Sequence, residues 1–252
     1  MKKMIIGNQI VKSFGEGEEQ RNVLDGVSLE IYEGEFIAVM GPSGSGKSTL
    51  MYALSGTDGV NGGKVVFDEK DLSAVGENEL ADLRRAYMGF VFQQPTMLKY
   101  LNILDNIILP SMRGNRRNGS KIIEKARAYM KRTGIAELEM RNITQVSGGQ
   151  LQRAGICRAL MNSPKIIFGD EPTGALNSKS AQEIMDIFSE INADGTAIML
   201  VTHDAKVAAR TERILFMRDG KIVSEMKLPR FDGTEMDARV ENVTMKMREI
   251  GI

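Results

Sequence analysis

Hydrophobic and polar residues alternate at the start of the chain. Residues 3–14 and 22–32 alternate well enough to predict two strands, and the acidic stretch 15–19 between them predicts a hairpin loop. Continuous apolar runs then recur, and a run of this kind is typical of a strand that is buried on both faces. These runs predict strands at residues 35–40, 64–67, 88–92, 165–169 and 196–201.

Apolar residues at helical spacing separate these strands. They predict helices at residues 48–54, 77–87, 151–160 and 178–191. Residues 101–141 are predicted to be mainly helical in two pieces, with turn residues at 114–119 between them. Apolar runs flank Asp219-Gly220 and predict a hairpin over 214–223. The order of elements predicts an α/β protein with an antiparallel β subdomain and an inserted helical subdomain.

Composition limits the class of protein. The chain has 252 residues with 33 basic and 33 acidic side chains, which argues against a broad, non-specific nucleic-acid binder. Cys157 is the single cysteine, so no intrachain disulfide can form, and its place in a predicted helix favours a buried apolar role. No apolar run approaches the roughly 18 residues of a membrane span. Polar Asn8 and Gln9 interrupt the signal-like start, so we expect a soluble, cytoplasmic chain.

The stretch 41–49 has the composition of a phosphate-binding loop. It reads Gly-Pro-Ser-Gly-Ser-Gly-Lys-Ser-Thr and lies between a predicted strand and a predicted helix, which is the context that this motif requires. Glycine lets the backbone approach an anion closely, and the helix N-terminus adds partial positive charge. Lys47 can reach the β- and γ-phosphates, and the Ser48 hydroxyl can bind Mg²⁺. The alternative is a Gly/Ser loop that carries a chance lysine.

Acidic residues end a later buried strand. Asp170 and Glu171 follow the apolar run 165–169 directly. Asp170 can hold Mg²⁺, and Glu171 can accept a proton from an attacking water. A pair of acids that caps a strand at the surface is the alternative, but the phosphate loop upstream favours a nucleotide site.

Three more polar groups occupy positions typical of ligand contacts. Gln93 ends the strand 88–92, and His203, the only histidine, follows the strand 196–201. Ligands of such sheets bind outside the carboxyl ends of the strands. Residues 147–150 read Ser-Gly-Gly-Gln before a predicted helix and offer a second anion-binding N-terminus. For Gln93 a solvent-facing loop amide is equally open, and by itself the stretch 147–150 fits a plain helix start.

The sequence around Phe14, and that of two charged segments, allows more than one role. Phe14 ends the first strand, where a core position is favoured over an aromatic face offered to a nucleobase. Arg113, Arg116 and Arg117 make a basic loop that is favoured as a solvated surface over an interaction surface. In the charged tail, apolar positions recur at helical spacing between Val240 and Ile250 and predict a short amphipathic helix packed on the body.

Taken together, these motifs resemble the ATP-binding subunit of an ABC transporter over nearly the whole chain. Residues 41–48 match the Walker A motif, 166–170 match Walker B, and 147–150 match the signature motif, which is the most specific to the family. The resemblance implies a P-loop NTPase core in residues 1–227, with the helical subdomain inserted at about 95–160. Residues 228–252 would form a C-terminal extension with a short amphipathic helix.

The resemblance also implies a role for each matching residue. It implies catalytic roles for Glu171, His203 and Lys47, and Mg²⁺ ligands at Ser48, Gln93 and Asp170. It implies ATP contacts at Phe14, Gly41, Pro42, Ser43, Gly44, Ser45, Gly46, Lys47, Ser48, Thr49, Gln93, Ser147, Gly148, Gly149, Gln150 and Asp170. Phe14 would stack on adenine.

The same resemblance implies the partners. Two ATP-binding subunits would pair head to tail, as a homodimer, and bind a membrane permease at the inner face of the cell membrane. The run 170–174, Asp-Glu-Pro-Thr-Gly, resembles the branch that serves lipoprotein release, macrolide efflux and export of, or resistance to, antimicrobial peptides such as bacitracin. Peptide export or resistance is our first choice within that branch.

Three positions depart from the commonest family pattern. Val146 replaces a leucine, Gly169 takes the last apolar position of Walker B, and Asn177 replaces an aspartate that normally links the two ATP sites. Two other classes of protein fit the sequence less well. An ABC ATPase acting on DNA normally separates its halves by long coiled coils, and no heptad run is present here. A GTPase would need Asn-Lys-x-Asp, which this sequence lacks.

Overall fold

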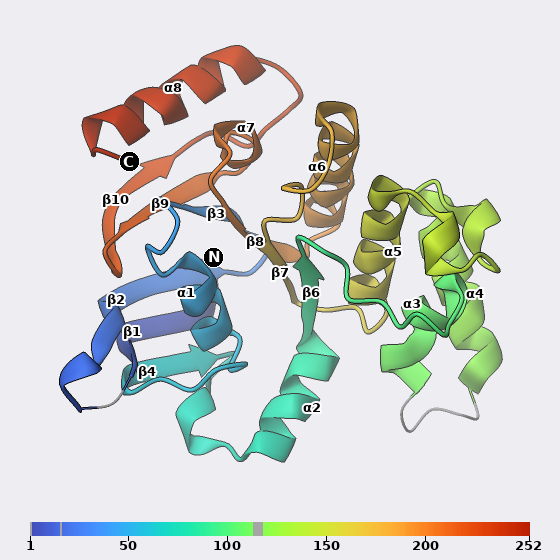
Figure 1. Ribbon diagram of the computed structural model, residues 1–252, viewed down its shortest axis with the longest axis horizontal. Coiled ribbons are helices and arrows are strands. Elements are labelled where there is room, and N and C mark those ends of the chain that lie inside the picture. The colour runs from blue at the N-terminus through green and yellow to red at the C-terminus, as the bar shows by residue number, and fades with distance from the viewer. Residues whose placement is uncertain (1, 16, 113–117) are drawn as a thin grey trace.

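Two β-sheets form the body of the protein, and a group of helices lies to one side (Figure 1). The computed structural model describes residues 2–15, 17–112 and 118–252. The larger sheet has six strands in the order β10-β9-β3-β8-β7-β6, and the smaller has four in the order β2-β1-β4-β5. The strands of the larger sheet are β3 (Phe36–Met40), β6 (Met88–Phe92), β7 (Ile166–Asp170), β8 (Ala197–Thr202), β9 (Arg213–Arg218) and β10 (Lys221–Lys227).

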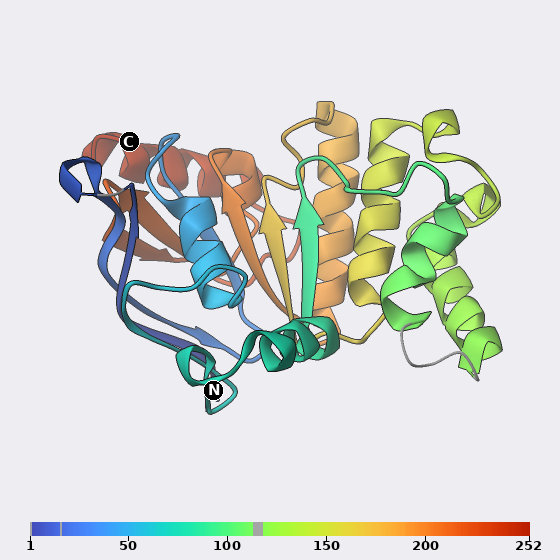
Figure 2. The same ribbon diagram turned by 60° about the horizontal axis from the view of Figure 1, so that its bottom comes forward.

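The larger sheet is parallel except for its edge strand β10. Every residue of β3 and β8 is buried, because helices and the second sheet cover both faces. Helix α1 (Lys47–Leu54) packs with the smaller sheet on the face that presents Ile37 and Val39. The opposite face is covered by α5 (Gly148–Leu160) and α6 (Ser178–Ala193). Figure 2 shows the ends of β6, β7 and β8 at one edge of the sheet.

The smaller sheet is antiparallel, as the alternating pattern predicts. Its strands are β1 (Lys3–Phe14), β2 (Arg21–Tyr32), β4 (Gly62–Phe67) and β5 (Lys70–Asp71). Phe14 pairs with Arg21 at the far end of the β1–β2 hairpin, and 50% of Phe14 is exposed. The local interpretation of Phe14 as a core residue is therefore wrong, because the hairpin extends beyond the part of the sheet that is packed. The Lys12 ammonium lies 5.1 Å from the Phe14 ring centroid.

The helical part has a core of its own. It contains α3 (Ile103–Met112), α4 (Gly119–Arg132) and α5, and α2 (Glu77–Tyr87) leads into β6. Side chains of α3, α4 and α5 pack together around Ile107, Met130 and Cys157. Burial raises the pKa of the Cys157 thiol to about 12, and the thiol contacts Thr133 Oγ1 at 3.1 Å. The buried role predicted for this cysteine is confirmed, while Arg113, Arg116 and Arg117 lie outside the described residues.

The C-terminal part folds back onto the larger sheet. Asp219 and Gly220 both have positive φ, and they turn β9 into β10 as the Asp-Gly signal predicts. After α7 (Ala205–Ala208) and this hairpin, α8 (Met236–Glu249) packs on the sheet through the fully buried Val243. The packed amphipathic helix predicted for the tail is confirmed. The domain limits at residue 227 and at about 95–160 remain predictions.

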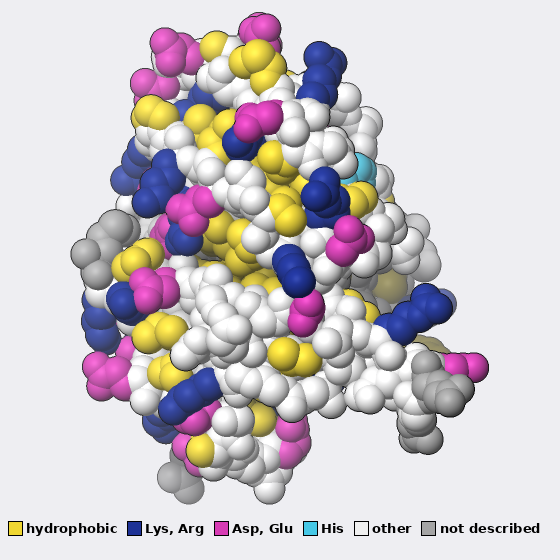
Figure 3. Space-filling model, turned by 90° about the vertical axis from the view of Figure 1, so that its left-hand side faces the viewer, with side chains coloured by type: hydrophobic (Ala, Val, Ile, Leu, Met, Phe, Trp, Pro, Cys, Tyr) yellow, Lys and Arg dark blue, Asp and Glu magenta, His cyan; other side chains and the backbone are white. Residues whose placement is uncertain are grey.

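One face of the molecule mixes charge with apolar surface. Hydrophobic side chains gather in a band between Lys, Arg, Asp and Glu side chains on the face seen from the left of Figure 1 (Figure 3). In the described part of the chain, no helix has the length and apolar character needed to cross a membrane.

Candidate functional site

The loop between β3 and α1 can be built only with glycine at two of its positions. A Cβ on Gly41 would lie 2.2 Å from the carbonyl oxygen of Met217. Gly46 has φ +98°, and a Cβ there would lie 2.6 Å from the carbonyl oxygen of Val23. Leu50 N donates to Gly46 O. The backbone amides just before Leu50 lie in the first turn of α1, where N–H groups have no helical carbonyl to bind. These amides give the loop the open donors that an anion requires.

Lys47 begins α1 and folds back over the loop. Its ammonium donates to Gly41 O at 2.9 Å and to Pro42 O at 2.8 Å. Burial lowers its pKa, while the nearby charges of Glu171 and Asp170 raise it in part. The Ser45 hydroxyl, also in this loop, is buried and has no hydrogen-bond partner within the described chain. A cation and an unpaired hydroxyl on one loop suit a ligand that carries several anionic oxygens.

Side-chain oxygen atoms of α1 and β7 meet beside the loop. Ser48 Oγ donates to Asp170 Oδ1 at 2.9 Å, and Tyr52 Oη donates to Asp170 Oδ2 at 3.3 Å. Hydroxyl and carboxylate oxygens are the ligand types that Mg²⁺ prefers, usually together with phosphate oxygens and water. Within the described ranges, no group of three or more His, Cys, Asp and Glu side chains is placed to hold a metal by itself. The residues present therefore fit Mg²⁺ that is shared with a phosphate ligand.

Tyr52 is a contact that sequence reasoning missed. It lies four residues after Ser48 on α1, so the two side chains share one face of the helix. Burial, and the charge of Asp170, raise the pKa of the Tyr52 hydroxyl, which keeps it a donor to that carboxylate. The spacing Ser-x-x-x-Tyr was the only signal available in the sequence.

Glu171 and His203 form a hydrogen-bonded pair at the ends of β7 and β8. His203 Nδ1 lies 2.8 Å from Glu171 Oε1, and the two side chains are 70% and 19% exposed respectively. Glu171 has φ +48°, which is strained for a residue with a side chain. Its amide donates to Val201 O at 2.9 Å, which ties the strained residue to β8. A carboxylate of this kind, beside a histidine, can orient and deprotonate a water.

One cleft collects half of the predicted residues. It has a volume of about 580 Å³, and the groups that line it come from β2, the loop, α1 and the ends of β6, β7 and β8. The lining residues are Val23, Ser43, Gly44, Gly46, Lys47, Ser48, Thr49, Gln93, Glu171, Val201 and His203. Gln93 also approaches the turn after β7, since a Cβ on Gly174 would lie 2.9 Å from Gln93 Nε2.

The second glycine-rich stretch does not line that cleft. Ser147 caps α5: its hydroxyl accepts from Gln150 N at 3.3 Å, and Gln150 Oε1 accepts from Ser147 N at 2.9 Å. Ser147 and Gly148 are exposed, and neither they nor Gly149 and Gln150 are among the cleft residues. Phe14 is likewise absent from the lining. One copy of the chain therefore keeps its two predicted anion sites apart.

Asn177 stands at the start of α6. Its side-chain oxygen accepts from Ser180 N at 2.9 Å and so caps the helix. An aspartate accepts the same bond, so the replacement changes the charge at this helix start while it keeps the cap.

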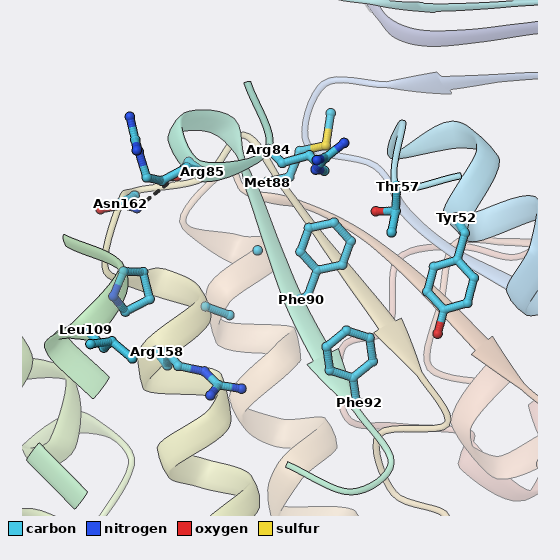
Figure 4. Close-up of a pocket in the computed structure, with 13 residues that line it drawn as sticks. Tyr52, Thr57, Arg84, Arg85, Met88, Phe90, Phe92, Leu109, Arg158 and Asn162 are labelled. Carbon is cyan, nitrogen blue, oxygen red and sulfur yellow. Dashed lines mark hydrogen bonds between the residues drawn. The ribbon is translucent and has the colours of Figure 1, made fainter. Parts of the chain in front are cut away.

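A second hollow lies between the sheet edge and the helical part (Figure 4). Its volume is about 530 Å³, and it is lined by Phe90 and Phe92 of β6 and by Leu109 and Pro110 of α3. In Figure 4 the two phenyl rings lie on the opposite side of β6 from Leu109. Arg84, Arg85 and Arg158 also line it; Arg84 pairs with Glu77 and Arg85 with Asp82, whereas Arg158 donates to Thr96 O. Asn162 Nδ2 donates to Arg85 O at 2.8 Å and links the two sides.

Comparison with known proteins identifies the family. The family model described as ABC transporter matches residues 24–174, which is more than half of the chain. The chain belongs to the ABC transporter family. It is an ABC ATPase domain with the P-loop NTPase fold that the Walker motifs predict. The resemblance to the branch of macrolide and peptide exporters is also confirmed by the relatives that follow.

Two similar proteins place this ABC ATPase among its relatives. It is 42% identical over 220 residues to the uncharacterized ABC transporter ATP-binding protein YknY of Bacillus subtilis, covering 87% of this chain and 95% of YknY. It is 40% identical over 216 residues to the macrolide export ATP-binding/permease protein MacB of Pasteurella multocida, covering 86% of this chain and 33% of MacB. The chain thus spans about a third of the length of the MacB proteins that it matches.

Solved cassettes have the same fold. A dimeric structure of the ATP-binding cassette MJ0796 in a post-hydrolysis state, bound to ADP and Pi, superposes with a TM-score of 0.84 at 38% identity. The match covers 90% of this chain and all of that one.

Proposed function

We propose that this ABC ATPase hydrolyses ATP with Mg²⁺ to power a membrane permease for export. The observation that carries the proposal is the 2.8 Å contact between His203 and Glu171 in the same cleft as Lys47 and Ser48. A pure binding module has no use for a carboxylate held in a strained backbone beside the phosphate loop.

Each residue of the cleft takes a defined part in this mechanism. The loop amides and Lys47 hold the phosphates, and Ser48 and Asp170 hold Mg²⁺, which supplies charge neutralisation when it is bound. Glu171 deprotonates the attacking water, and His203 orients Glu171 and contacts the γ-phosphate. Gln93, at the end of β6, reports the occupancy of the site to the helical part.

The proposed site is completed by a second copy of the chain. Ser147 and Gly148 are exposed at the N-terminus of α5 and do not reach the cleft of their own chain. We propose that they cover the ATP of a partner copy in a head-to-tail homodimer, as expected for two incomplete anion sites. The MJ0796 cassette is described as dimeric, which supports this arrangement.

Ser147→Arg tests the shared site. The arginine should obstruct the partner's ATP while it leaves Lys47 and the loop of its own chain intact. We expect normal nucleotide affinity by calorimetry and a loss of ATP turnover of at least about a hundredfold. Wild-type turnover per chain should rise with protein concentration. Ser120→Arg on α4 is the control, since Ser120 is exposed and lies outside the cleft. Normal turnover in Ser147→Arg would contradict the shared site.

The hollow of Figure 4 is the proposed contact for the permease. Phe92 lines it and directly precedes Gln93 in the chain, so an occupant would lie close to that glutamine. Its apolar floor and its three arginines suit an amphipathic permease helix with acidic residues. MacB carries ATP-binding and permease functions under one name, which supports a permease partner at the inner membrane face.

Leu109→Asp tests this contact. Leu109 is 46% exposed at the hollow, so a buried charge there should lower permease binding by about tenfold or more. ATP turnover of the isolated chain should not change. The measurement is co-purification with the co-expressed permease in detergent. Met140→Asp is the control, because Met140 is 70% exposed in the helical part and is not in the hollow. Equal recovery of permease with both variants would contradict the assignment.

The exported cargo is proposed to be an antimicrobial peptide. The run 170–174 supports this branch, and named relatives export macrolides or, with the qualifier probable, syringafactin. Macrolide efflux and lipoprotein release are the alternatives within the branch. Stimulation of ATP turnover in the reconstituted complex by bacitracin, and not by a macrolide, would favour the peptide. These relatives do not favour a function on DNA.

A further inference from the structure

The segment that follows β10 is anchored on the turn after His203. Arg239 of α8 is only 7% exposed, and its guanidinium donates to three backbone carbonyls. Nε donates to Ala209 O at 2.6 Å, Nη2 to Thr211 O at 3.0 Å and Nη1 to Pro229 O at 2.9 Å. A buried cation is costly unless its donors are satisfied, and here the three carbonyls satisfy them.

An aromatic side chain reinforces this anchor. The Phe231 ring centroid lies 5.4 Å from Arg239 Cζ and 5.1 Å from Arg210 Cζ, so two guanidinium groups pack on one ring. Arg210 is 8% exposed and pairs with Asp186 of α6. The residues before and within α8 are thereby joined to α6 and to the end of α7.

Only a few residues of chain separate the anchored turn from His203. Asp204 N donates to Thr202 Oγ1 at 3.0 Å, and Asp204 Oδ1 accepts from Lys206 N at 2.8 Å, which begins α7. Helix α7 has only four residues, and Ala209, an acceptor of Arg239, follows it directly. Figure 1 shows α7 beside α8 at the end of β8. A displacement of this turn would therefore reach the backbone of His203.

The His203 ring is largely open to solvent. Its side chain is 70% exposed, and its Nδ1 is hydrogen-bonded to Glu171. On the side that faces α6, the turn borders a cavity of about 920 Å³, lined by Asp204 and Val207 among others. The position of the ring thus depends on the backbone of the turn.

We propose that the segment 228–252 positions His203 for ATP hydrolysis and that Arg239 is the positioning residue. Arg239 is not among the residues that line the cleft and acts through the carbonyls of Ala209 and Thr211. The inference rests on the proposed role of His203 in the cleft.

The test combines Arg239→Ala and Arg239→Lys with a His203→Ala background. Misplacement of a reacting group by about 1 Å can lower a rate by about 10²-fold, so we expect Arg239→Ala to lower kcat by about 10- to 100-fold. The KM for ATP and the Kd for nucleotide should be unchanged. Arg239→Lys keeps the charge but cannot reach three carbonyls, so its kcat should fall between those of Arg239→Ala and the wild type.

The double variant separates positioning from general stability. In the His203→Ala background, Arg239→Ala should have no further effect on single-turnover hydrolysis. Arg230→Ala is the matched control, because Arg230 lies in the same segment but is exposed and pairs only at 3.8 Å with Glu212. An unchanged kcat in Arg239→Ala, or an equal further loss in the His203→Ala background, would overturn the proposal. Absence of turnover in the wild type would instead refute the proposed function.

Discussion

Replacement of Glu171 with Gln is expected to lower the rate of ATP hydrolysis by about 10²- to 10⁴-fold with nucleotide affinity retained. The amide keeps the size of the side chain and its place near His203, but it cannot accept the proton of the attacking water. Since ATP then persists, the closed dimer should accumulate. Size-exclusion chromatography with ATP and Mg²⁺ should show a dimer for this variant, and phosphate release should be nearly absent.

Glu190→Gln is the control for Glu171→Gln. Glu190 is exposed on α6 and pairs at 3.5 Å with Arg132, far from the cleft residues. It should hydrolyse ATP at the wild-type rate. Hydrolysis near that rate by Glu171→Gln would remove Glu171 as the base.

Replacement of Lys47 with Ala is expected to weaken ATP binding by about 10- to 150-fold. The ammonium is held over the loop by Gly41 O and Pro42 O, and charge-assisted hydrogen bonds to phosphate contribute about 1.5–3 kcal/mol. Calorimetry with ATP and Mg²⁺ measures the loss. Lys64→Ala is the control, since Lys64 forms an exposed pair with Asp71 in the smaller sheet. Unchanged affinity in Lys47→Ala would exclude Lys47 from phosphate binding.

The elements around the cleft could be predicted because their signals are local. Continuous apolar runs predict β3, β7 and β8, and the burial of these strands confirms the pattern. The structure also explains a departure from the family pattern. A Cβ on Gly169 would lie 2.6 Å from Leu200 Cδ2 of β8, so a side chain at the last apolar position of Walker B would require Leu200 to shift. That restriction comes from a neighbouring strand and has no local signal.

Contacts between distant segments account for what the sequence did not predict. The apolar positions of the charged tail predict a helix with an apolar face that includes Val243, which is confirmed. Arg239 lies one turn before Val243 and is nevertheless buried, because its donors bind two carbonyls of the turn after α7, Ala209 O and Thr211 O, and one carbonyl at the start of the tail, Pro229 O. No sequence pattern within the tail predicts these hydrogen bonds. For Phe14 the predicted strand is correct, but the predicted burial is wrong. Whether Phe14 is buried depends on how far the packed part of the sheet extends along β1.

The register in which β7 pairs with β8 also determines whether Glu171 and His203 are placed for ATP hydrolysis. Ile167 is paired with Ile198 and Asp170 with Val201, so Glu171 follows β7 at the level of Thr202, one residue before His203. A slip by one residue would turn every side chain of β8 to the opposite face of the sheet. Loss of activity can therefore originate deep in the hydrophobic interior, among residues that never meet the nucleotide, and a screen for inactive variants should recover them.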